Sequence, residues 1–211
     1  MISLPLVYTI LALVSYTSSF WYLFIHLMSK RTPNLWCYGL IVVLGLILHG
    51  LVLSQDMITP LGVNYDVFNL ISFTSGLMLS LSLILSLIRP ILPLNLIGIP
   101  VAAIGLILGF SLSQSNQTIE HHGVGLDTHI ILSLSAYAVL LMATIQAVLL
   151  WFQDRELKKK QKKRIWVNLL PPFQVMESLL FDLIITGFGL LTTALIFGFF
   201  TIDNFFAQHL A

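Results

Sequence analysis

Six stretches of mostly apolar residues run through this chain of 211 residues, and each is long enough to cross a lipid bilayer. A hydrocarbon core of about 30 Å requires about 20 residues of α-helix. The stretches are roughly 5–28, 36–54, 68–88, 91–113, 127–152 and 175–201. Only 9% of the residues are charged, whereas soluble domains carry about 25%. The sequence therefore predicts an all-α fold, a polytopic bundle of six transmembrane helices that forms a single transmembrane domain over residues 1–211.

The basic residues lie only in alternate connections between these stretches. Lys30 and Arg31 follow the first stretch, Arg89 follows the third, and the others lie within 155–164. Because cytoplasmic loops are enriched in Lys and Arg, this pattern predicts that both termini face outward. The segment 153–174 is then a basic cytoplasmic loop. Its charges favour an anchor on anionic membrane lipid over a nucleic-acid or protein docking patch, because no aromatic residues alternate with them.

Two histidines lie near the predicted outer ends of their stretches. His49 is about five residues, or ~8 Å, from the end of the second stretch, and His129 is ~3–5 Å into the fifth. Gly45 and Ser133, one turn away, leave space beside them. Two opposed neutral imidazoles form a six-coordinate b-type haem site. The residues by themselves leave two interpretations equally open, namely haem ligands or hydrogen-bonded packing residues.

Other candidate chemistry is sparse. His121 and His122 in the outer loop could supply an alternative axial ligand, whereas His26 near Lys30 is typical of a membrane interface. The single cysteine, Cys37, excludes a paired-thiol site within the chain. No nucleophile–base constellation, phosphate loop or zinc motif occurs, so we expect that the protein is not an enzyme.

Polar and small residues within the stretches predict helix contacts. A carboxylate inside a membrane is costly, so we expect Asp182 to hydrogen-bond Gln146, with a proton relay as the alternative. The fourth stretch carries a stripe of small residues, which favours close helix packing over space for a flat cofactor. The stripe comprises Gly98, Ala102, Gly105 and Gly109.

The stretch HIILSLSAYAVLLMATIQAVLLWFQDRELKKK (129–160), followed by LPPFQVMESLLFDLIITGFGLLT (170–192), resembles the cytochrome c assembly family, specifically its HemX-like and YpjD-like branch. ILHGLVL (47–53) and FNLIS (68–72) also fit that branch. The resemblance implies a multi-pass protein of the bacterial inner membrane with haem-binding relatives. It also implies that His49 and His129, which match intramembrane histidines of the family, are ligands of the iron of haem b.

Two features differ from the family pattern. Members that deliver haem carry a tryptophan-rich WWD segment in an outer loop. Here none of the tryptophans lies in an outer loop; they are Trp21, Trp36, Trp151 and Trp166. Members of this branch usually continue into further helices, so the end at Ala211 indicates either a truncated chain or a short member.

The sequence thus predicts an inner-membrane haem-binding protein linked to cytochrome c assembly or haem homeostasis, without a haem-lyase platform. Two alternatives remain. One is a non-haem accessory subunit that stabilises a membrane protein partner. The other, less favoured, is a small transporter that uses Asp182.

Overall fold

The computed structural model describes residues 3–29, 31–59, 62–113, 118–119, 124–158 and 170–201. Within these residues six helices are long and apolar enough to cross a membrane, as predicted. They are α1 (Leu4–Met28), α2 (Leu35–Met57), α3 (Val67–Ile88), α4 (Asn95–Leu112), α5 (Val124–Leu157) and α6 (Phe173–Thr201), with a short 3₁₀ turn, η1 (Leu92–Leu94), before α4.

Local sequence signals explain where several helices begin. Pro5 lies in the first turn of α1, where its missing N–H leaves no hydrogen bond unmade. The side chain of Asn34 accepts hydrogen bonds from the backbone N–H groups of Trp36 and Cys37 and so caps α2. Asp66 caps α3 in the same way. These polar residues fix the starts of helices whose interiors are almost wholly apolar.

The fifth helix is longer than the sequence indicated. We expected it over 127–152, but α5 runs from Val124 to Leu157. Helix needs backbone hydrogen bonds rather than apolar side chains, and the added turns have partners of their own. Gln153 donates to the carbonyl of Pro171 before α6, and Lys158 forms an ion pair with Asp154 one turn away. The start of the predicted 153–174 loop is therefore helical, whereas 159–169 lie outside the described residues.

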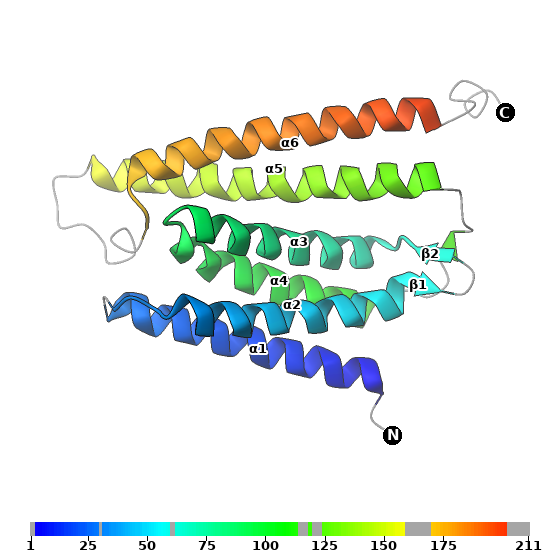
Figure 1. Ribbon diagram of the computed structural model, residues 1–211, viewed down its shortest axis with the longest axis horizontal. Helices are drawn as coiled ribbons and strands as arrows, with labels where there is room; N and C mark the ends of the chain where they lie inside the picture. The colour runs from blue at the N-terminus through cyan, green and yellow to red at the C-terminus, as the bar shows by residue number, and fades with distance from the viewer. Residues whose placement is uncertain are drawn as a thin grey trace.

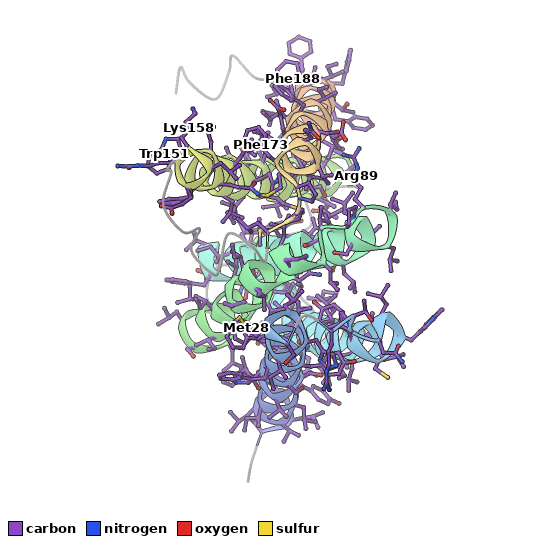
Figure 2. All side chains as sticks on the ribbon, turned by 90° about the vertical axis from the view of Figure 1, so that its left-hand side faces the viewer. Met28, Arg89, Trp151, Lys158, Phe173 and Phe188 are labelled. Carbon is purple, nitrogen blue, oxygen red and sulfur yellow. The ribbon has the colours of Figure 1, made fainter. Side chains whose placement is uncertain are left out.

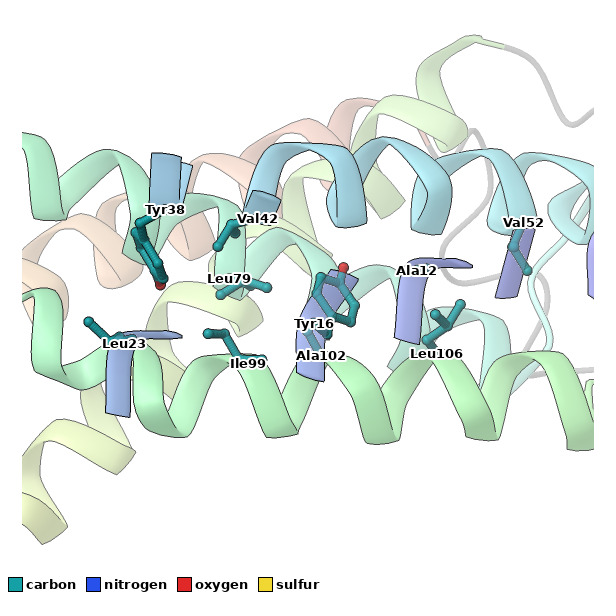
Figure 3. Packing of buried hydrophobic residues seen from close by; sticks show 10 residues of the cluster. All are labelled: Ala12, Tyr16, Leu23, Tyr38, Val42, Val52, Leu79, Ile99, Ala102 and Leu106. Atoms are coloured by element: carbon teal, nitrogen blue, oxygen red, sulfur yellow. The ribbon is translucent and has the colours of Figure 1, made fainter. Parts of the chain in front are cut away.

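The helices form three antiparallel hairpins that lie side by side (Figure 1). The α3–α4 hairpin is in the middle, because α4 packs on α1 and α3 packs on α5. One apolar core fills the space among α1, α2, α3 and α4 and contains Tyr16 and Tyr38 (Figure 3). A second core lies between the middle hairpin and α5–α6.

The small-residue stripe of α4 is used for close packing. A Cβ at Gly105 would lie 2.7 Å from Cβ of Ser75, and one at Gly109 would lie 2.7 Å from Cβ of Ser72. Both contacts are shorter than real Cβ atoms allow, so only glycine permits this approach of α3 and α4. These two positions of the stripe are thus packed against α3, and a cavity of about 340 Å³ adjoins Gly105 and Ser75.

A small sheet joins two connections that the sequence indicated only as short polar loops. Strands β1 (Ile58–Thr59), β2 (Gly62–Asn64) and β3 (Thr118–Ile119) are antiparallel, and Val63 of β2 pairs with Ile58 on one side and Ile119 on the other. The sheet lies at the same end of the bundle as the start of α1 and the end of α6 (Figure 1). The end of α3, next to Arg89, and the end of α5, next to Lys158, lie at the opposite end (Figure 1). That the sheet end faces outward remains a prediction from charge.

Candidate functional site

His49 is buried in the middle of a hydrogen-bonded chain that crosses three helices. Its Nδ1 lies 3.0 Å from the hydroxyl oxygen of Tyr16 on α1, and its Nε2 lies 2.9 Å from the hydroxyl oxygen of Ser72 on α3. Only 2% of His49 is exposed, and Tyr16 is fully buried. Both ring nitrogens are therefore engaged, and the imidazole is held in one orientation.

Glycines from two helices make room for this chain, although not as predicted. The space beside Gly45 is filled by Tyr16, since a Cβ there would lie 2.7 Å from Cε1 of the tyrosine ring. The glycine against the imidazole is Gly76 of α3, where a Cβ would lie 3.3 Å from Cε1 of His49. His49 and Ser72 both line a cavity of about 200 Å³ between α2 and α3. The neighbour of His49 thus comes from a different helix, which spacing along α2 could not reveal.

His129 on α5 faces α6. Its Nδ1 lies 2.8 Å from the backbone carbonyl oxygen of Ala194. Because a carbonyl can only accept, Nδ1 carries the proton, and in the neutral ring Nε2 then carries the lone pair. Gly198, one turn after Ala194, lies directly against the ring, since a Cβ there would be 2.8 Å from both Cε1 and Nδ1. His129 is only partly buried. Its orientation is the one that suits ligation through Nε2.

The two histidines are held by different parts of the bundle. The partners of His49 belong to α1 and α3, whereas the partner of His129 belongs to α6. A second cavity, of about 390 Å³, lies between α2, α3 and α5, and its lining includes Gly50 next to His49 and Ile131 two residues after His129. It shares Gly50, Leu53 and Phe73 with the cavity at His49. The described residues contain no group of three or more His, Cys, Asp or Glu that could hold a metal ion.

The expected pairing of Asp182 with Gln146 is wrong. Asp182 forms an ion pair with Arg89, whose guanidinium also donates to the Ser178 hydroxyl at 3.0 Å. Gln146 is buried and donates instead to the backbone carbonyl of Met176. The side chain of Asp182 is 52% exposed, so the carboxylate lies on the outside of the bundle beside the α3–α4 turn. A charged partner from that turn neutralises it, which spacing between α5 and α6 did not indicate.

A polar contact fastens the sheet to the helix that carries His129. The Tyr65 hydroxyl donates to Oδ1 of Asp127 at 2.6 Å, and Asp127 lies two residues before His129. Partial burial, together with this carboxylate, raises the pKa of the Tyr65 phenol above its ordinary value. The contact ties the connection after β2 to the first turn of α5. The alternative ligands His121 and His122 lie outside the described residues.

Comparison with protein families decides the class of this protein. A family model for cytochrome C assembly protein matches residues 4–211. The chain belongs to the cytochrome c assembly protein family. No curated protein and no solved structure gave a match. The family match confirms the predicted family, whereas the HemX-like and YpjD-like branch remains a prediction.

Membership of this family places the chain in cytochrome c biogenesis. Proteins of the cytochrome c assembly family are associated with haem handling. The match and the six apolar helices together identify a multi-pass membrane protein in contact with lipid, and they support the predicted location in the bacterial inner membrane. The sequence signals that found the family lie mostly on α5 and α6. Sequence reasoning missed Tyr16 and Gly76, whose contacts with His49 come from other helices.

Proposed function

We propose that this member of the cytochrome c assembly family binds haem b at the sheet end of the bundle and takes part in cytochrome c assembly or haem homeostasis. The observation that supports this most is the hydrogen bond from Nδ1 of His129 to the carbonyl of Ala194. Histidines that bind metals usually donate their second ring N–H to a carbonyl or carboxylate, which fixes the tautomer and the ring orientation. His129 has this arrangement before any ligand is bound.

His49 fits a haem iron under one condition. His49 and Ser72 both line the 200 Å³ cavity, and the Ser72 hydroxyl lies 2.9 Å from Nε2 of His49. Ligation through Nε2 therefore requires the Ser72 hydroxyl to turn away. Binding pockets for small molecules and cofactors are mostly apolar clefts of about 300–1,000 Å³. The adjoining cavity of 390 Å³ is lined chiefly by apolar residues and lies in this range.

Each residue of such a site would have a distinct role. His129 and His49 would hold the iron, Ala194 and Gly198 would orient His129, and the apolar walls would exclude water. A bound haem would supply a redox-active iron, whose potential follows its ligands and burial. Haem would be held by ligation and packing, because the chain has one cysteine and no Cys-x-x-Cys-His motif. Without a tryptophan-rich outer loop, we favour haem binding or sensing over delivery to an acceptor.

The visible spectrum of the purified protein tests this proposal. Protein from haem-replete cells should show a Soret band, and His129→Ala should lose most of it. His26→Ala is the matched control, because His26 also bonds a carbonyl through Nδ1, that of Tyr22 within α1, at the other end of the bundle. A colourless wild-type protein that also fails to bind added ferric protoporphyrin would refute the proposal.

One observation favours a second function, that of a non-haem accessory subunit. Both nitrogens of His49 already have hydrogen-bond partners, as a pure packing residue requires. The face of α6 that carries Phe188 points away from the bundle and is available to a membrane partner (Figure 2). Co-purification of a stoichiometric membrane protein with a colourless chain would support this function. The main reason to consider a transporter was a carboxylate within the membrane, and Arg89 forms an ion pair with that carboxylate, Asp182, outside the helix interfaces. We retain the proposals that the protein is not an enzyme and binds no nucleic acid.

A further inference from the structure

We propose that Tyr16 and Ser72 are opposed positioning residues that set whether His49 can act as a ligand. Tyr16 holds Nδ1 of the imidazole, and the Ser72 hydroxyl caps Nε2. This inference rests on the proposed function, since it concerns the ligation of His49. It adds that the Nε2 lone pair of His49 is either blocked by Ser72 or free to bind a metal.

Ser72 differs from most hydroxyl-bearing residues of its own helix, as does Ser82, which bonds the Asn95 side chain. Several other hydroxyls of α3 bond a carbonyl three or four residues earlier, as serine and threonine commonly do within helices. These are Thr74, Ser75, Ser80 and Ser86. Ser72 instead reaches across to Nε2 of His49 at 2.9 Å. A serine in a helix can instead bond the carbonyl four residues earlier, which for Ser72 is that of Phe68.

The two ring nitrogens of His49 need different hydrogen-bond partners. A neutral imidazole has one N–H and one lone pair. If Nδ1 donates to the Tyr16 oxygen, the lone pair lies on Nε2 and accepts the Ser72 hydroxyl. This tautomer is the one that can ligate a metal through Nε2. When Tyr16 accepts from Nδ1, Ser72 donates to the lone pair that ligation would need; in the opposite tautomer Tyr16 donates to Nδ1 and Nε2 donates to Ser72. We assign the first arrangement to His49.

The three hydrogen-bonded side chains lie in the interior of the bundle. Tyr16 is fully buried, and His49 and Ser72 are each 2% exposed, so these contacts are shielded from bulk solvent. Gly76 leaves the ring face open, and the cavity of about 200 Å³ begins at His49 and Ser72. When the Ser72 hydroxyl turns away from Nε2, that nitrogen loses its hydrogen-bond partner next to the cavity that His49 lines.

Substitutions of Ser72 and Tyr16, the two partners of the His49 ring, should change the affinity for ferric protoporphyrin in opposite directions. Ser72→Ala removes the cap and should raise the affinity for ferric protoporphyrin by about two- to ten-fold, the worth of one net hydrogen bond. Tyr16→Phe removes the partner that orients the ligand and should lower the affinity by about ten-fold or more. Ser80→Ala is the matched control: Ser80 lines the same cavity on the same helix, but its hydroxyl bonds Gly76. It should leave the affinity unchanged.

A second measurement uses the protein without porphyrin. In ¹⁵N-histidine NMR, assigned with His49→Ala, Ser72→Ala should shift Nε2 of His49 toward the signal of an unbonded lone-pair nitrogen, and Ser80→Ala should not. Equal losses of affinity in Ser72→Ala and Tyr16→Phe, or an unmoved Nε2 signal in Ser72→Ala, would overturn the inference and make both residues packing partners. If neither wild type nor Ser72→Ala binds ferric protoporphyrin, the proposed function fails, and the nitrogen spectra still decide whether Ser72 caps Nε2.

Discussion

Replacing Gly198 with alanine should destabilise the contact between α5 and α6 and displace His129. The new Cβ would lie 2.8 Å from both Cε1 and Nδ1 of the imidazole, and an ordinary contact begins at 3.4 Å. The ring or the helix must therefore move by about 0.6 Å. Such a movement disturbs the 2.8 Å hydrogen bond from His129 to Ala194.

The magnitude follows from three terms. Overpacking costs about 1–3 kcal/mol, and loss of the hydrogen bond costs about 1 kcal/mol. The higher helix propensity of alanine offsets about 1 kcal/mol. Gly198→Ala should therefore lower the free energy of unfolding by about 1–3 kcal/mol. Gly189→Ala, on the same helix with no atom within 4 Å of the new Cβ, should be neutral or stabilising by up to about 1 kcal/mol.

Denaturant unfolding of the three proteins in one detergent measures the difference, with helix content followed by circular dichroism. If haem binds as proposed, Gly198→Ala should also weaken the Soret band, and Gly189→Ala should not. Equal stability of the two alanine variants would refute the reasoning, because it would mean that the ring of His129 does not lie against Gly198.

Further predictions concern other contacts. Gly105→Ala should destabilise the α3–α4 packing by about 1–3 kcal/mol in the same unfolding assay, because its Cβ would collide with Ser75. The folded protein raises the pKa of Tyr65 and so favours its neutral phenol. The resulting contribution to stability is fully present below the phenol's ordinary pKa of about 10 and is lost as the pH rises through and beyond that value. Tyr65→Phe should therefore reduce the loss of stability between about pH 9 and 11, and an unchanged pH profile would contradict this. Asp182→Asn should change stability by less than about 1 kcal/mol, because its ion pair with Arg89 is substantially exposed; a larger loss would indicate a buried role.

Helix number and position could be predicted closely because they depend on runs of apolar residues along the chain. The expected stretch 68–88 corresponds to α3 at Val67–Ile88, and 175–201 corresponds to α6 at Phe173–Thr201. The larger error in α5 arose at its polar C-terminal end, where hydropathy falls but the helix continues to Leu157. The sheet was missed because two- and three-residue strands from separate loops carry no pattern of their own.

The candidate residues were predicted less completely than the helices. Hydropathy and spacing singled out His49 and His129, and the resemblance gave them a role that the family match supports only at the level of haem handling. The partners of Asp182 could not be predicted, because an ion pair between Arg89 and α6 joins residues far apart in sequence. The same limit applies to Tyr16, which reaches His49 from a different helix.

The sequence alone determined that this chain is a six-helix membrane protein of the cytochrome c assembly family and that two histidines lie within its helices. These properties follow from apolar length, the distribution of charge and local motifs, all of which are read along one dimension. Only the tertiary structure decided what each imidazole touches: hydroxyls of α1 and α3 for His49, and a carbonyl of α6 for His129. Which nitrogen carries a proton, and which can bind a metal, depends on those contacts, because a ring's tautomer is set by the groups around it.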